Sequence, residues 1–296
     1  MGNVDHWSVS NSLPPCRLFP IFARSAPRAV IFRRGPTNWY QLILWHTDTD
    51  RFEFGQWFKG RIHVRRSDLS PDGGKLIYFA HKITARTIQD KEYTYAWTAV
   101  SKPPYLTALA LWPKGDSWHG GGLFDDDETL FLNHKPDQAQ PHPNHLPQGL
   151  DVRPNPDARG ERDPIFGMRL ERDGWQLQQE WKLTFQKGAM YVTEAPEIRS
   201  RTHPQKPYSI QLTRRLDCLT YRELFAVMDQ NGDGLADCRE ADWVDWDHNG
   251  RLVLLRDGKL FVGLERDNNH FSIQRLVDFN PHRPEPVVSP AWARRW

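Results

Sequence analysis

The chain has little cysteine and no long apolar run. Its 296 residues contain three cysteines, Cys16, Cys218 and Cys238, which form no CxxC pair. An odd and sparse cysteine count argues against a disulfide framework and against a structural zinc site. No stretch approaches the roughly 18 apolar residues that a membrane span requires. The N-terminal residues show no basic stretch followed by an apolar one, so we expect no secretory signal, a cytoplasmic location and no membrane partner.

Charge and motif content exclude further classes of function. Lys and Arg number 39 against 37 Asp and Glu, a formal net charge of +2, so nucleic acid is not an expected partner. The sequence contains no GxSxG nucleophile elbow, no phosphate-binding glycine loop, no HExxH and no kinase signature. No residue is therefore predicted to be catalytic, and no organic cofactor is expected.

Two stretches of the chain have the same pattern. Residues 67–79 read SDLSPDGGKLIYF and residues 242–255 read DWVDWDHNGRLVLL. When Leu76 is aligned with Leu252, Lys75 falls on Arg251, and in each stretch a polar, Asp-bearing turn leads into an apolar strand. The spacing of 176 residues equals four steps of 44, and roughly 40 to 50 residues is the length of one propeller blade.

The repeat predicts an all-β fold, a single irregular β-propeller domain of roughly five to seven four-stranded blades over residues 1–296. The mean hydropathy of −0.70 suits short, half-buried strands joined by polar loops. A β-sandwich with insertions is the competing architecture. Residues 133–163 are rich in proline and lack apolar periodicity, so we expect a long inter-strand loop there.

Several strands can be placed from the apolar pattern. Residues 29–33 and 39–46 flank a turn-forming cluster, and residues 252–256 and 259–264 flank the Asp257-Gly258 turn of a predicted hairpin. Strands are also expected at residues 164–170 and 175–185.

The turn at residues 67–80 carries a family resemblance. SDLSPDGGKLIYFA resembles the WD-repeat-like motif of TolB-type propellers, in which a Ser-Pro-Asp-Gly turn precedes an aliphatic and aromatic strand. As a whole the chain resembles a group of bacterial propeller proteins. The resemblance implies a fold and no activity, and its TolB-like part would imply a periplasmic address.

One loop has the spacing of a calcium site. DQNGDGLADCRE places oxygen ligands at the positions that an EF-hand uses, and residues 222–228 before it could form the entering helix. Ala236, where an EF-hand has a large aliphatic residue, and the strand that soon follows argue against an EF-hand. The pattern also resembles the calcium loops of FG-GAP-type propeller repeats, and a hairpin turn without metal is the third interpretation. The predicted ligands of a structural Ca²⁺ ion are Asp229, Asn231, Asp233, Leu235, Asp237 and Glu240.

Histidine and tryptophan residues are weaker candidates for metal ligands and for a ligand-binding platform. Four histidines near the proline-rich loop could hold a transition metal or simply be exposed, namely His119, His134, His142 and His145. Four tryptophans could form a ligand platform or pack in the core, namely Trp97, Trp112, Trp118 and Trp175.

Two functions of different classes follow. The absence of catalytic motifs favours a non-catalytic interaction scaffold that binds a protein or peptide. The alternative is a propeller enzyme, a hydrolase or lyase, with its site at one mouth of the axial channel. Charged side chains that converge around a pocket at that mouth would favour the enzyme, and a plug of apolar side chains would exclude it.

Overall fold

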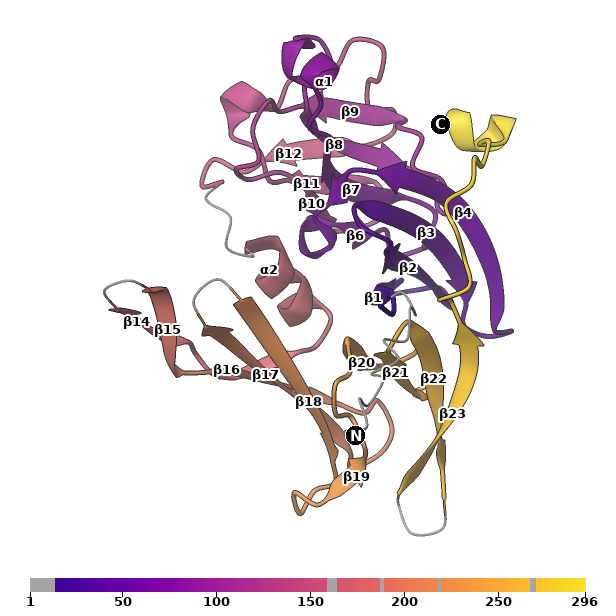
Figure 1. Ribbon diagram of the computed structural model, residues 1–296, viewed down its shortest axis with the longest axis vertical. Coiled ribbons are helices and arrows are strands. Elements are labelled where there is room, and N and C mark those ends of the chain that lie inside the picture. Colours follow the sequence, from indigo (N-terminus) through magenta and orange to yellow (C-terminus); the bar gives the residue numbers. More distant parts are fainter. Residues whose placement is uncertain (1–13, 159–163, 187–188, 218–219, 267–269) are drawn as a thin grey trace, which may run out of the picture.

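The protein is a five-bladed β-propeller (Figure 1). The computed structural model describes residues 14–158, 164–186, 189–217, 220–266 and 270–296. Their strands form five small sheets around a common centre, and this confirms the predicted fold class with a blade number inside the expected range. In this described part, no helix is long and apolar enough to cross a membrane.

The first and fifth blades are the regular ones. Each is a four-stranded antiparallel meander, as the apolar runs at residues 29–33, 39–46 and 252–264 predict. The first blade consists of β1 (Arg17–Phe22), β2 (Arg28–Arg34), β3 (Trp39–His46) and β4 (Arg51–Lys59). The fifth consists of β20 (Trp243–Trp246), β21 (Leu252–Arg256), β22 (Lys259–Glu265) and β23 (Phe271–Asp278).

The other blades depart from four strands. The second has five: β5 (Arg61–Ile62), β6 (Asp68–Leu69), β7 (Leu76–His81), β8 (Ala96–Ser101) and β9 (Ala110–Pro113), with helix α1 (Ala85–Gln89) after β7 and the 3-10 turn η1 (Val64–Arg66) before β6. The third has three: β10 (Gly122–Phe124), β11 (Thr129–Leu132) and β12 (Asp151–Pro154). The fourth has seven: β13 (Gln176–Gln179), β14 (Lys182–Gln186), β15 (Ala189–Ala195), β16 (Glu197–Thr202), β17 (Ser209–Asp217), β18 (Thr220–Met228) and β19 (Gly234–Ala236).

The uneven blades correct two expectations. The two repeated turns lie in the second and fifth blades, so three blade steps separate them, and the four steps of 44 residues were wrong. The predicted loop at residues 133–163 contains the 3-10 turn η2 (Pro136–Gln138) and the strand β12, which pairs in parallel with β11. Residues 159–163 of that loop lie outside the described part.

Helix α2 (Pro164–Arg172) lies near the centre of the ring, between the third and fourth blades (Figure 1). Its buried side chains are Ile165, Phe166, Arg169 and Leu170. Their spacing is that of a helix, so the strand predicted at residues 164–170 was wrong. Gly174, with a φ of +90°, ends the helix, because its N–H and that of Trp175 bond back to the carbonyls of Glu171 and Leu170 in a Schellman motif.

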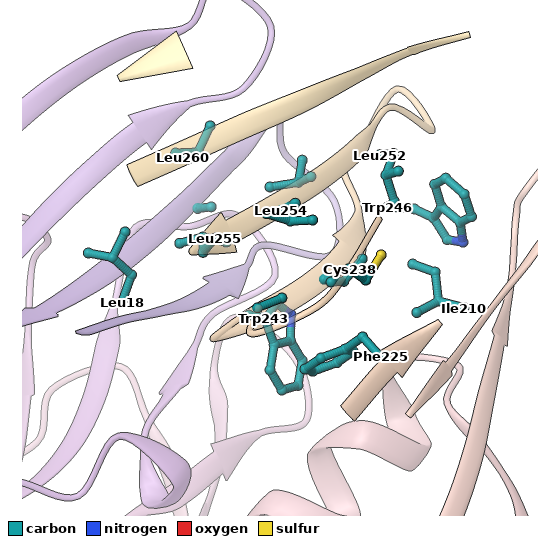
Figure 2. Close-up of a cluster of buried hydrophobic side chains, with 14 of the residues drawn as sticks. Leu18, Ile210, Phe225, Cys238, Trp243, Trp246, Leu252, Leu254, Leu255 and Leu260 are labelled. Atoms are coloured by element: carbon teal, nitrogen blue, oxygen red, sulfur yellow. The ribbon is translucent and has the colours of Figure 1, made fainter. Parts of the chain in front are cut away.

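The largest hydrophobic cluster joins the fifth blade to the first blade, the fourth blade and α2 (Figure 2). Aromatic rings form its centre: Trp243 packs against Trp175 and Phe225 at centroid distances of 6.0 and 5.4 Å. The four tryptophans named as platform candidates differ in burial. Trp112 and Trp175 are buried, Trp97 is half-buried, and Trp118 is exposed.

The repeated turns bind each blade to the next one. In the second blade, Lys75 Nζ donates to the carbonyl of Asp127 in the third blade at 2.9 Å. In the fifth blade, the aligned Arg251 donates two hydrogen bonds of 2.9 Å, from Nη1 and Nη2, to the carboxylate of Asp50 in the first blade. The alignment of Lys75 with Arg251 therefore corresponds to one structural task, which is to fasten neighbouring blades.

The ring closes where the start of the described chain meets the residues that flank the fifth blade. Asp242, before β20, accepts a hydrogen bond of 3.2 Å from the Leu18 N–H of β1, and Asn280 accepts one of 2.9 Å from the Cys16 N–H. The last segment then crosses the outer edges of the first two blades and ends in the 3-10 turn η3 (Ala291–Arg294). Among the described strands, none is exchanged between the first and fifth blades, so contacts made by side chains hold this junction.

Candidate ligand-binding cleft

A cleft of about 480 Å³ opens near the centre of the ring. Its walls come from the end of β1 and the turn that follows, from α2 and the turn after it, from the end of β16, and from β20. Four arginines line it, Arg24, Arg169, Arg172 and Arg201, against three aspartates, Asp173, Asp245 and Asp247. Phe22 and the edges of three tryptophans add apolar wall.

Arg172 anchors one side of the cleft. Its guanidinium forms a bidentate pair with the fully buried Asp68 of β6, at 2.6 and 2.9 Å. It also donates to Oδ1 of Asp173 at 2.9 Å and to the Phe124 carbonyl at 3.0 Å. Asp68 accepts in turn from the Phe124 N–H at 2.8 Å, so this network joins α2 to the second and third blades.

Asp245 and Asp247 hold the opposite wall in shape. Asp245 is paired with Arg201, and its two oxygens accept from the Trp246 N–H at 2.8 Å and from the Trp243 Nε1–H at 3.2 Å. Asp247 accepts from two backbone N–H groups of its turn and from Arg251 Nε at 2.7 Å. Both carboxylates are fully engaged, so their role is to position β20 and the turn after it.

Asp173 is different because one of its oxygens is free for a ligand. Oδ1 accepts from Arg172, whereas within the described residues Oδ2 has no partner and the side chain stays 22% exposed. Burial raises the pKa of this carboxyl, and the neighbouring Arg172 charge lowers it without cancelling that effect. A carboxyl that keeps its proton to a higher pH inside a cleft is suited to donate that proton.

The predicted calcium residues lie away from this cleft. Residues 222–228 belong to strand β18, so the EF-hand entering helix was wrong, and the segment from Asp229 to Asp233 is the turn between β18 and β19. Asp229 Oδ1 accepts from the N–H groups of Asn231 and Asp233 at 2.8 and 2.9 Å, and Asp237 pairs with Arg239 at 2.9 Å.

The remaining predicted ligands do not complete a cluster. The predicted ligand at Leu235 is its carbonyl oxygen, and the side chain of this residue packs into the core; Glu240 is exposed with a φ of +58°. In the part of the chain that the structure describes, no three His, Cys, Asp or Glu side chains are grouped as a metal site. Calcium binding by this turn stays a prediction, in its propeller-loop form.

The histidines of the proline-rich region are engaged in structural contacts. His134 is buried, with Nε2 beside Thr98 Oγ1 at 2.8 Å and Nδ1 beside the Gln138 carbonyl at 3.0 Å. His142 stacks on Tyr93 and pairs with Glu92 at 3.0 Å. Burial lowers the pKa of His134 to about 4, which keeps this ring neutral.

The cysteines carry no visible chemistry. Cys16 and Cys238 are free and buried, and burial raises the pKa of each thiol to about 11. A thiol with so high a pKa is a poor nucleophile. Cys218 lies outside the described residues.

Sequence reasoning missed the cleft residues because the signal for α2 was misassigned. The spacing of Ile165, Phe166, Arg169 and Leu170 would have indicated a helical face with an arginine among the apolar positions. No signal in one sequence would have shown that Arg172 meets Asp68, a residue 104 positions earlier.

Comparison with known proteins adds little. No family model and no curated protein matches the chain. Among solved structures, the chain is similar to the GH43 protein BlXynB from Bacillus licheniformis, at 12% identity with a TM-score of 0.29, and to a mutant form of the same protein, at 10% identity with a TM-score of 0.31. Each match covers 96% of this chain and 59% of the other, and a likeness this low carries no argument about activity.

Proposed function

We propose that the protein binds a small polar molecule in the central cleft. The observation that carries this proposal is the cleft itself: arginine and aspartate side chains converge on a space of about 480 Å³, within the usual range for small-ligand sites. Charged side chains that converge around a pocket are also the pattern that the enzyme alternative requires.

The proposal is tested by closing the cleft. Thr202 is exposed at its rim, so Thr202→Trp should obstruct entry without disturbing the core. Small polar compounds that bind the parent in a ligand-observed NMR screen should fail to bind this variant. Thr49→Trp, at an exposed turn of the first blade, is the matched control and should bind like the parent. Hits that bind the obstructed variant equally well would contradict the proposal.

A catalytic role follows if Asp173 transfers its proton to the bound molecule. The free Oδ2 atom and the raised pKa support this extension, which corresponds to a hydrolase or lyase. Its test is a panel of p-nitrophenyl esters, phosphates and glycosides. If Thr202→Trp abolishes the hydrolysis of one of these substrates, the rate of that hydrolysis should also fall at least 100-fold in Asp173→Asn. The Asp173→Asn variant should still bind the compound. Turnover that survives in Asp173→Asn would remove this residue from the chemistry.

The scaffold hypothesis stays a prediction. Large apolar side chains are exposed on the described surface, but they come from different parts of the ring, for example Ile83, Trp118, Leu224 and Leu264. These positions do not single out one blade as a docking face for a protein or peptide.

A further inference from the structure

One guanidinium in the cleft is buried with most of its donors unused. Arg169, on α2, is only 4% exposed and lines the cleft. Its Nη1 donates to the carbonyl of Ser67, the one acceptor that it has among the described residues. The ring centroids of Phe19 and Phe166 each lie 5.3 Å from the guanidinium carbon and 6.0 Å from each other, so both rings contact the guanidinium from the same side. The Nε and Nη2 donors have no acceptor among the described residues, so this N–H edge is the part that can meet a ligand.

The nearby carboxylates serve other arginines. Asp68 and Asp173 are both bound to Arg172, and Asp245 is bound to Arg201. Within the described ranges, no carboxylate oxygen lies within 4 Å of an Arg169 nitrogen. Arg24, at the rim, donates to the carbonyls of Phe124 and Asp125 rather than to a carboxylate. Within the described residues, Arg24 and Arg169 therefore have no carboxylate partner.

Burial does not remove the charge of Arg169. It lowers the pKa of the guanidinium to about 10, which still leaves the group protonated at neutral pH. A buried charge without a paired counter-charge is unfavourable, and a guanidinium edge matches two oxygens of a carboxylate or phosphate. An oxyanion at this edge would supply both the missing charge and the missing acceptors.

Resting on the proposed function, we propose that the ligand of the cleft is a small organic oxyanion whose carboxylate or phosphate group binds Arg169. The Asp173 Oδ2 atom and the apolar wall around Phe22 would face the rest of the molecule. The Arg169 guanidinium, which has no carboxylate partner, thus selects for a negatively charged ligand, and the cleft volume of about 480 Å³ limits the size of that ligand.

The test compares charged and neutral probes on matched variants. Malonate and inorganic phosphate should raise the melting midpoint of the parent above that in sodium chloride of equal ionic strength, whereas malonamide, the neutral counterpart of malonate, should not. Arg169→Met should weaken anion binding at least tenfold in calorimetric titrations. Arg153→Met removes an exposed arginine of β12 and is the control, with anion affinity unchanged.

A second substitution guards against a misfolded variant. Arg169→Lys keeps the charge and loses the two-pronged edge, so it should retain binding that is several-fold weaker than in the parent. Equal anion affinity in the parent, Arg169→Met and Arg169→Lys would overturn the inference. If neutral compounds bind and Thr202→Trp excludes them while anions have no effect, the cleft proposal stands and the oxyanion proposal falls. If no compound responds to Thr202→Trp, the cleft proposal falls first.

Discussion

Replacement of Arg251 should weaken the closed ring more than any other single change in the repeated turns. This side chain leaves the fifth blade, binds both oxygens of Asp50 in the first blade, and donates to the buried Thr47 carbonyl at 2.7 Å. It also holds Asp247 of its own turn at 2.7 Å. Arg251→Met would remove the charged donor that all these acceptors share.

The magnitude follows from the partial burial of the pair. Side-chain exposures of 30% for Arg251 and 26% for Asp50 place it between an exposed ion pair, worth up to about 1 kcal/mol, and a buried one, whose disruption costs about 3–5 kcal/mol. We expect Arg251→Met to lower the free energy of unfolding by about 2–3 kcal/mol. The aligned Lys75 makes a single bond to a carbonyl across its blade junction, so Lys75→Met should cost about 1 kcal/mol or less.

Urea denaturation followed by tryptophan fluorescence measures both values. A double-mutant cycle with Asp50→Asn should give a coupling energy of about 1–2 kcal/mol between positions 50 and 251. Asp50 also accepts from Trp45 Nε1 at 3.1 Å, a bond that asparagine can preserve. If Arg251→Met costs no more than Lys75→Met, or if the coupling is near zero, the first and fifth blades are not fastened by this pair.

Three further predictions concern other parts of the ring. Burial raises the pKa of Asp242 to about 6, so the folded state keeps a proton that the unfolded chain loses above about pH 4. The free energy of unfolding should therefore fall as pH rises from 4 to 6. In urea titrations, Asp242→Asn should be more stable than the parent by about 2–3 kcal/mol at pH 7.5 and equally stable at pH 4. A methyl group at Gly121, which has a φ of +77°, would lie 1.9 Å from the Arg66 carbonyl oxygen. Gly121→Ala should therefore lower the free energy of unfolding, measured by urea denaturation, by more than about 2 kcal/mol. A smaller loss would mean that the segments of Gly121 and Arg66 separate easily. If the turn at Asp229 binds calcium, millimolar Ca²⁺ should raise the melting midpoint relative to chelator and Asp233→Ala should abolish the rise; equal midpoints in the parent would leave only a hairpin turn.

The fold was predictable where local signals agree with the tertiary arrangement. The Asp-bearing turns at residues 67–79 and 242–255 do lead into strands β7 and β21, and Asp257-Gly258 does join β21 to β22. Such turns depend on neighbouring residues alone, because an aspartate side chain accepts from N–H groups two to four residues onward. The blade spacing failed because insertions in the third and fourth blades change the distance between repeats.

The cleft was not predictable for a physical reason. Its charged residues come from the turn after β1, from α2 and the turn after it, from β16, and from β20 and the turn after it, and their pairing depends on how elements distant in sequence meet. Sequence patterns report which face of an element is apolar, but they do not report which carboxylate meets which guanidinium. Arg169 has no carboxylate partner because Arg172 binds Asp68 and Asp173 and Arg201 binds Asp245, and only the assembled ring shows this.

The junction between the first and fifth blades has a consequence for synthesis on the ribosome. The first blade is complete early, yet its buried Leu18 and Trp45 belong to a cluster whose other members come largely from α2 and from the fourth and fifth blades. Arg251 and Asp50 are separated by 201 residues, and at about 5–20 residues per second this distance takes on the order of 10–40 s to translate. During that interval the nascent blade exposes apolar side chains that the finished ring hides. The chain is therefore expected to depend on chaperone protection, and slower translation of its last third should lengthen the vulnerable period.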